Sequence, residues 1–255
     1  LINDPKKHMF RKIGKPQKEE VLKALVGETI TKDGIGGETA FNLWKEHLAK
    51  ANVPVDHPRN LAFVPAAPTR AAIMFDLVTS VSSIHGAYWM EGAGGIFCEN
   101  EAMKWIVSLT GLPEGAFGVF TSGGTAANLS AIVTAREHWR EDDTYKREKG
   151  LIITSSGAHS SIKAMAKVAD VDILLVDSEE KLTGTALRKT IDNLNFHQRK
   201  RLFAVVATGG TTNAGIIDDL EAIATICEKE NIWFHVDAAY GGGALVADSV
   251  RHLFN

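Results

Sequence analysis

This sequence of 255 residues has almost no cysteine and no long hydrophobic run. Its two cysteines, Cys98 and Cys227, lie far apart and lack the histidine spacing of a zinc site. Their scarcity argues against a disulfide framework or a bound metal and is usual in a reducing compartment, so we expect a cytoplasmic protein. No apolar run approaches the roughly 20 residues of a membrane span. Residues 1–16 lack the apolar centre of a signal peptide, so we expect no membrane contact.

A strong charge of either sign is also missing. The sequence has 28 Lys and Arg residues against 31 Asp and Glu residues, a net charge of −3. This balance offers no basic surface for nucleic acid at the level of the whole chain. Hydrophobic residues make up 45% of the sequence, which is enough for a sizeable core. The length allows one large domain or two small ones.

The first hundred residues are expected to be mainly helical. Apolar residues recur there at helical spacing, and a glycine-containing break at 93–95 precedes the last helix. The predicted helices are 18–26, 39–51, 69–82 and 100–110. Residues 56–65 are bounded by prolines and are expected to be extended. We therefore expect a helical segment over residues 1–100 and a second, α/β domain over residues 101–255.

From Gly118 onward, short apolar runs alternate with helical patterns. Strands are predicted near Val119 and at 151–154, 172–176, 202–207 and 232–236. Helices are predicted between them at 125–139, 159–168, 183–194 and 218–229. Alternation at this spacing predicts a mainly parallel sheet with helices on both faces. The carboxyl ends of its strands share one edge, where α/β folds bind their ligands.

The last predicted strand ends in an acid at this edge. The apolar run that starts at Ile232 reaches Asp237, which two alanines and a glycine cluster follow. A carboxylate at a partly buried strand end is costly unless a cation or a hydrogen-bond donor meets it. Asp237 is therefore expected either to face a ligand or to cap the next turn as a structural residue.

Three other turns bring glycine, hydroxyl and histidine groups to the same edge. Residues 121–125, Thr-Ser-Gly-Gly-Thr, precede a helix whose free N–H groups suit a phosphate, unless this is an ordinary capped turn. His159 begins another helix, where a neutral imidazole can stack on a flat ring or simply cap the helix. Residues 208–215 form a third turn, which is either ligand-lining or plain. Together the turns indicate a site for a flat aromatic cation bearing a phosphate, which pyridoxal phosphate fits.

Four motifs give the chain a family resemblance. They are Thr121–Leu129 (TSGGTAANL), Ala158–Ser161 (AHSS), Ala207–Asn213 (ATGGTTN) and His235–Gly241 (HVDAAYG). In this order they resemble the pyridoxal-phosphate-dependent group II amino-acid decarboxylases, which include the aromatic-amino-acid and glutamate decarboxylases. The resemblance implies the fold-type I architecture of aspartate aminotransferase, a homodimer, and decarboxylation of an L-amino acid to an amine and CO2.

The resemblance also implies roles for individual residues. Carried over motif by motif, the cofactor-binding positions are Gly124, Thr125, His159, Thr212, Asp237 and Ala239. Gly124 and Thr125 would bind the phosphate, with the third motif beside the ring. His159 would stack on the pyridine ring, Ala239 would pack on its other face, and Asp237 would pair with its nitrogen. His159 and Asp237 would thereby be the catalytic residues of this chain.

The extended stretch His57–Pro65 looks like the substrate-pocket segment of the same family, so Phe63 and Pro65 would contact the substrate side chain. One departure is large: the family's Schiff-base lysine follows the HVDAAYG strand, whereas this chain has no lysine after Lys229. The small C-terminal domain is missing as well, so we expect the chain to be part of a longer enzyme. The alternatives are another fold-type I enzyme (lyase, aldolase or aminotransferase), a binding or dimerisation fragment, and a dinucleotide-binding dehydrogenase, for which Gly123-Gly124 lacks a third glycine.

Overall fold

A parallel four-stranded sheet is the centre of the second half of the chain. The computed structural model describes residues 16–55, 57, 59–60, 62–64, 66–178 and 180–254. The chain divides into two compact units, Leu1–Gly92 and Ala93–Asn255. The candidate cofactor positions 124–239 all belong to the second unit.

The sheet of the second unit has the order β2-β1-β3-β4. Its strands are β1 (Leu151–Ser155), β2 (Asp172–Val176), β3 (Leu202–Thr208) and β4 (Trp233–Asp237). All three pairings are parallel. Every residue of β1 and β3 is buried, as expected for central strands covered on both faces. The predicted mainly parallel sheet is confirmed.

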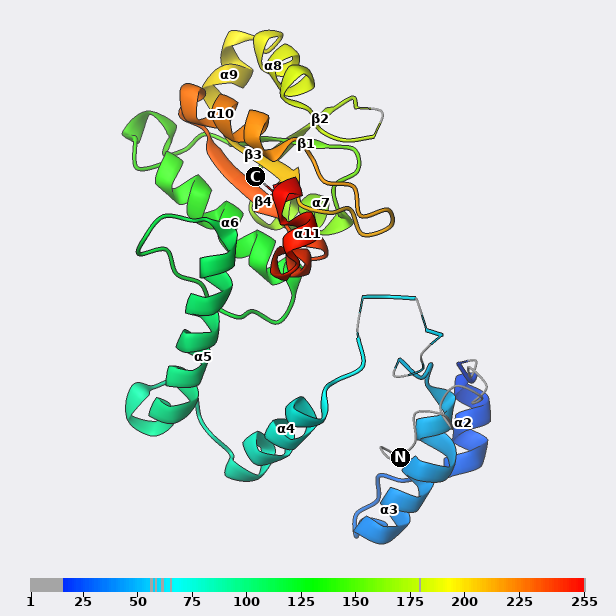
Figure 1. Cartoon of the computed structure of the whole chain (residues 1–255). Coiled ribbons are helices and arrows are strands. Elements are labelled where there is room, and N and C mark those ends of the chain that lie inside the picture. The colour runs from blue at the N-terminus through cyan, green and yellow to red at the C-terminus, as the bar shows by residue number, and fades with distance from the viewer. Residues whose placement is uncertain are drawn as a thin grey trace. The chain divides into compact units, whose positions relative to one another are not determined.

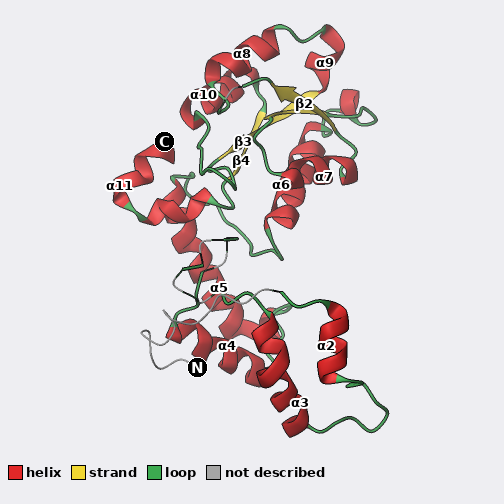
Figure 2. Ribbon diagram, turned by 90° about the vertical axis from the view of Figure 1, so that its right-hand side faces the viewer, coloured by secondary structure: helices red, strands yellow, loops and turns green. Residues whose placement is uncertain are grey.

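Helices cover both faces of this sheet (Figures 1 and 2). On one face, α6 (Gly124–Trp139) and α7 (Ser160–Val168) bury Ile132 and Met165 against Ile152. On the other, α8 (Gly184–Asp192) and α10 (Leu220–Glu230) bury Leu187 and Ile223 in a second core. The remaining elements of this unit are η3 (Asp143–Tyr145), α9 (Phe196–Arg201), η4 (Gly241–Val246), α11 (Asp248–Arg251) and η5 (His252–Phe254). This is the predicted α/β architecture.

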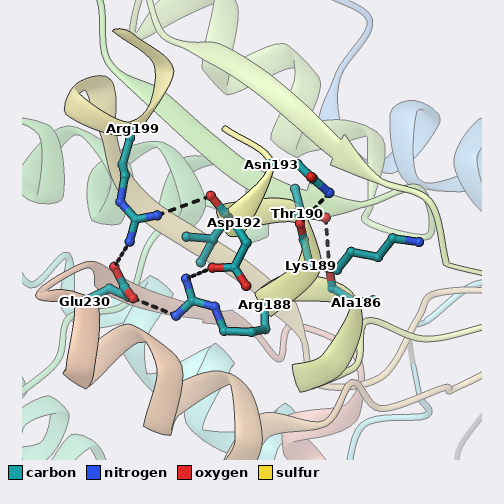
Figure 3. Close-up of polar contacts among 9 residues, drawn as sticks. Ala186, Arg188, Lys189, Thr190, Asp192, Asn193, Arg199 and Glu230 are labelled. Carbon is teal, nitrogen blue, oxygen red and sulfur yellow. Dashed lines mark hydrogen bonds and ion pairs between the residues drawn. The ribbon is translucent and has the colours of Figure 1, made fainter. Parts of the chain in front are cut away.

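A network of charged side chains ties the outer helices together (Figure 3). Glu230 of α10 lies 2.6 Å from Arg188 of α8 and 2.6 Å from Arg199 of α9. Arg188 also meets Asp192 one turn along α8, at 2.8 Å. Hydrogen bonding from Arg188 holds the pKa of Glu230 below its ordinary value. Three helices that are separate in sequence are thus joined on the face of the sheet opposite α6 and α7.

Two predictions for the region before α6 were wrong. Val119 lies in neither a strand nor a helix, and its side chain is 70% exposed. A strand requires a hydrogen-bonding partner, and no described strand pairs with this stretch. The helix predicted from residue 100 begins earlier: α5 (Trp89–Thr110) contains non-helical backbone only at Gly92. Glycines at 94 and 95 cost about 1 kcal/mol each relative to alanine, which did not end the helix.

The described part of the first unit is helical, as predicted. It contains α2 (Glu19–Val26), α3 (Gly37–Leu43), η1 (Trp44–Leu48), η2 (Ala49–Ala51) and α4 (Arg70–Ser82). Thr69 caps α4 by accepting a hydrogen bond from the N–H of Ala72. Across the described chain, no helix combines the length and the apolar character that crossing a membrane requires.

Candidate active site

Asp237 is fixed at the carboxyl end of β4 by two neutral donors. Its side chain is only 8% exposed. One carboxylate oxygen, Oδ1, accepts a hydrogen bond from the N–H of Ala239 at 3.2 Å. The other, Oδ2, accepts from Nδ2 of Asn128 in α6 at 2.9 Å. The bond from Ala239 is the local cap that was one of the two expectations for Asp237. The bond from Asn128 holds the carboxylate from α6, a helix distant in sequence.

A neutral histidine lies behind this acid on the same face of β4. His235 precedes Asp237 by two residues, and Nε2 of its ring lies 2.8 Å from Oδ1 of Asn128. Burial lowers the pKa of His235, and the charge of Asp237 only partly opposes that shift. The imidazole is therefore neutral at pH 7. Because an amide oxygen can only accept, the proton lies on Nε2.

His159 is the N-cap of α7, the helix that follows β1. The Nδ1 atom of His159 accepts a hydrogen bond from the N–H of Ser161 at 3.2 Å. The hydroxyl of Ser161 lies 2.9 Å from the same nitrogen. The capping role considered from the sequence is therefore present. The rest of the ring is exposed, so one imidazole serves both as a cap and as an accessible flat surface.

The start of α6 has the backbone of an anion cradle. Gly123 has φ of +152°, a conformation that L side chains rarely adopt. The N–H groups of Ala126 and Ala127 return to the Gly123 carbonyl at 3.0 and 3.1 Å. Among the described residues, this leaves the first N–H groups of the helix, those of Gly124 and Thr125, directed outward without an acceptor. Such groups at a helix N-terminus favour a phosphate.

The loops after the strands touch one another at this edge. A Cβ on Gly124 would lie 3.2 Å from the Cβ of Ala239, so α6 begins against the exit of β4. A Cβ on Gly157, after β1, would lie 3.7 Å from the side chain of Thr211, after β3. The neighbouring Thr212 is exposed. The sequence-predicted turns are therefore gathered at one edge of the sheet.

A buried hydroxyl at the same edge has no partner. Thr208 ends β3, is 4% exposed, and pairs in register with Asp237. Its Oγ1 has no hydrogen-bond partner among the residues that the structure describes. An unpaired buried hydroxyl is costly, so it is the kind of group that a bound ligand satisfies. Together with the cradle of α6 and the small Ala239, it makes the edge fit a phosphorylated pyridine.

The two residues predicted to contact substrate belong to the first unit. Phe63 is 78% exposed and has φ of +63°, a backbone conformation uncommon for a bulky residue. Pro65 lies outside the described residues. The contact of Phe63 and Pro65 with substrate stays a prediction.

Sequence reasoning missed four residues of this site. They are Asn128, Ser161, Thr208 and His235, all of which lie within or beside the quoted motifs. One signal was available: Asn128 is a polar residue on the buried stripe of α6, one turn before Ile132. A polar residue in a core stripe indicates a buried partner.

Comparison with known proteins supports the family resemblance. The family model "Pyridoxal-dependent decarboxylase conserved domain" matches residues 42–255. An aromatic-L-amino-acid decarboxylase of Bacillus atrophaeus is 29% identical over 97% of this chain and 52% of its own length. An L-2,4-diaminobutyrate decarboxylase of Acinetobacter baumannii is 27% identical over 92% of this chain and 50% of its own length. The chain thus spans about half the length of these curated relatives.

A solved structure agrees with the fold. The crystal structure of mouse CSAD matches 96% of this chain and 53% of its own length, with a TM-score of 0.84 and 26% identity. The predicted fold-type I architecture and the resemblance read from the four motifs are both confirmed. Since the family model matches most of the sequence, the chain belongs to the pyridoxal-phosphate-dependent amino-acid decarboxylase family.

Proposed function

We propose that the protein carrying this chain is a carboxy-lyase that converts an L-amino acid into its amine and CO2. The observation that carries the proposal is the buried carboxylate of Asp237, held at the strand edge by Asn128 and by the N–H of Ala239. When bound, pyridoxal phosphate supplies a protonated pyridine ring that accepts the electron pair released from the Cα–carboxylate bond. Asp237 would face the ring nitrogen, and its negative charge would favour the protonated form of that nitrogen.

The other residues of the edge bind and orient the cofactor. Gly124 and Thr125 would donate their N–H groups to the phosphate. His159 and Ala239 would pack on opposite faces of the ring, with Thr212 beside it. The imidazole is flat and the alanine is small, so together they would hold the ring plane without obstructing it. The exposure of these positions supports this assignment, because a ligand can reach each of them.

The substrate is proposed as an L-amino acid whose side chain meets Phe63 and Pro65. The two relatives are named for an aromatic amino acid and a diamino acid. The proposal therefore concerns only the α-amino-acid group that both share. The exposure of Phe63 supports this proposal, because a ligand can reach its side chain. We propose the cytoplasm as the compartment, supported by the free thiols of Cys98 and Cys227.

We further propose that the protein is a homodimer. Helix α4 has no buried residue, although most of it is apolar. Its large exposed side chains are Met74, Phe75, Leu77, Val78 and Val81. Apolar surface of this extent on one helix is typical of a protein interface. Light scattering should give twice the monomer mass, and Phe75→Glu should shift the protein toward monomer; a monomeric wild-type protein would contradict the proposal.

The decisive experiment is a product assay on the full-length protein with pyridoxal phosphate and the common L-amino acids. Release of CO2 with formation of the amine supports the proposal. Formation of a keto acid instead supports an aminotransferase, and cleavage to an aldehyde supports an aldolase. Binding of pyridoxal phosphate without turnover of any L-amino acid supports a binding role.

A further inference from the structure

The side chain of Asn128 joins three functional groups through one buried amide. Asn128 is 4% exposed and lies on the sheet-facing side of α6. Its Nδ2 donates to Oδ2 of Asp237 at 2.9 Å and to Oγ of Ser161 at 3.2 Å. Its Oδ1 lies 2.8 Å from Nε2 of His235. Both N–H hydrogens of the amide, and its oxygen, therefore take part in hydrogen bonds.

The chemistry of the partners fixes the direction of each hydrogen bond. A carboxylate only accepts, so the amino side of Asn128 must face Asp237 and its oxygen must face His235. The hydroxyl of Ser161 accepts one of the amide hydrogens, so its own proton is available for Nδ1 of His159, 2.9 Å away. Two donors, this hydroxyl and the N–H of Ser161, then converge on Nδ1. Nδ1 of His159 is therefore an acceptor, which leaves Nε2 to carry the ring proton.

An amide at this position is unfavourable for the helix alone. Asn128 shares its buried stripe with Ile132 and Ala135, where an apolar side chain would pack without the need for partners. Asparagine has low helix propensity, and an unpaired buried amide costs several kcal/mol. Once all its partners are in place, however, such a group holds them in a single arrangement. We therefore expect Asn128 to act by fixing the positions of its hydrogen-bond partners.

We propose that Asn128 is a positioning residue that links Asp237 to His159 through Ser161 as one hydrogen-bonded unit. The inference rests on the proposed function, in which Asp237 and His159 contact the same pyridine ring at different places. Asp237 meets the edge of the ring at its nitrogen, and His159 meets a face. The relative position of the two therefore sets where the pyridine can lie. Asn128 contacts neither the cofactor nor the substrate, and acts only through its neighbours.

Three substitutions remove different sets of hydrogen bonds from this network. Asn128→Leu removes all of its hydrogen bonds. Asn128→Asp keeps the shape and still accepts from His235, but places a second carboxyl group against Asp237, so that the two acids compete for one proton. Ser161→Ala removes the hydroxyl that joins Asn128 to His159 and leaves the bond from the N–H of residue 161 to His159 in place. Thr134→Ala is the matched control, because the hydroxyl of Thr134 bonds only to the carbonyl of Ser130 on the exposed side of the same helix.

Nitrogen NMR of the imidazole rings tests the network without cofactor. In the wild-type protein and in Thr134→Ala, we expect His235 to carry its proton on Nε2. In Asn128→Leu the His235 ring should become a mixture of tautomers, whereas in Asn128→Asp it should keep the Nε2 proton. Ser161→Ala should change the resonances of His159 and leave the proton of His235 on Nε2, because the bond from His235 to Asn128 remains. A His235 ring that keeps its wild-type spectrum in Asn128→Leu overturns the inference.

Fluorescence titration with pyridoxal phosphate tests the consequence for the site. Both Asn128 variants should bind about tenfold more weakly, the loss expected for one hydrogen bond to a charged group. Thr134→Ala should bind as the wild type does. Asn128→Asp and Ser161→Ala keep the shape of the site, so the test does not depend on the folding of Asn128→Leu. Unchanged affinity in both Asn128 variants overturns the inference. A wild-type protein that binds no pyridoxal phosphate contradicts the proposed function instead, and the histidine spectra then decide on the network.

Discussion

Thr208 and Asp237 are register partners across β3 and β4, and their side chains project from the same face of the sheet. Both side chains are buried, but only that of Asp237 has hydrogen-bond partners among the described residues. Asp237 accepts two hydrogen bonds, whereas Oγ1 of Thr208 has no partner among the described residues. Each oxygen of the charged group thus has a hydrogen-bond donor, whereas the neutral hydroxyl beside it is buried without one.

The buried hydroxyl of Thr208 predicts opposite effects on stability and on binding. Thr208→Val keeps the shape and removes an unpaired polar group, so the cofactor-free protein should gain about 1 kcal/mol in free energy of unfolding. Its affinity for pyridoxal phosphate should fall several-fold, because the hydroxyl would lose the hydrogen bond that a polar group of the bound cofactor would supply. Urea unfolding and fluorescence titration measure the two effects.

The control for this change is a threonine whose hydroxyl is paired. Oγ1 of Thr154 in β1 donates to the carbonyl of Val206 at 2.9 Å and is equally buried. Thr154→Val should therefore lose about 1 kcal/mol of stability. If both variants were destabilised alike, the hydroxyl of Thr208 would have to be paired, and its availability to a ligand would be excluded.

Asp237→Asn should abolish most of the decarboxylation while the protein stays folded. The amide keeps the size of the side chain but cannot hold a proton on the pyridine nitrogen by its charge. We expect turnover by the full-length enzyme to fall by about 100-fold or more, on the scale of losing a group that stabilises developing charge. Asp248→Asn serves as control, because that carboxylate is 96% exposed. Near wild-type turnover by Asp237→Asn would refute the role of the acid.

The fold was predictable from the sequence where its signals are local. The strand 172–176 was predicted with its observed ends, and the helix predicted at 125–139 begins one residue earlier. Both patterns depend on side-chain spacing within a few residues. The strand predicted near Val119 failed because a strand also needs a partner, which no local pattern supplies.

The site was predictable in outline for a different reason. Parallel strands end at a common edge, so the position of Asp237 relative to the turn at 121–125 followed from topology. The bond from Asn128 to Asp237 spans 109 residues, and the bond to Ser161 spans 33. Such contacts depend on how far α6 is rotated about its axis, which only packing of the whole domain determines. The sequence contained these residues without indicating their partners.

The close approach of Gly241 to Gly209 predicts that a larger residue does not fit at position 241. A Cβ at this position would lie 2.1 Å from the carbonyl oxygen of Gly209, closer than atoms can approach. Gly241→Ala must therefore push the start of η4 away from the end of β3, at a cost of about 1–3 kcal/mol. Gly243 lies in the same short helix, and a Cβ there would have no described atom within 4 Å. Thermal unfolding should show a clear loss for Gly241→Ala and little change for Gly243→Ala; equal effects would contradict the close approach.

The ion pairs of Glu230 predict how stability depends on pH. Hydrogen bonding from Arg188, together with the charge of Arg199, lowers the pKa of Glu230 in the folded protein. A carboxyl whose folded pKa is lowered stabilises the protein above its unfolded pKa and loses that contribution as the pH falls through the folded pKa. Glu230→Gln should therefore lower the free energy of unfolding by about 1 kcal/mol near neutral pH, given the partial exposure of the network.

This difference between wild type and Glu230→Gln should shrink in acid, as the pH drops below the ordinary glutamate value of 4.5. Urea unfolding at a series of pH values measures it. Glu101→Gln is the matched control, because Glu101 and Lys104 form an exposed pair within one helix, and such pairs contribute little. A deficit in Glu230→Gln that stayed constant down to low pH would mean that packing of the side chain, and not its charge, joins α8, α9 and α10.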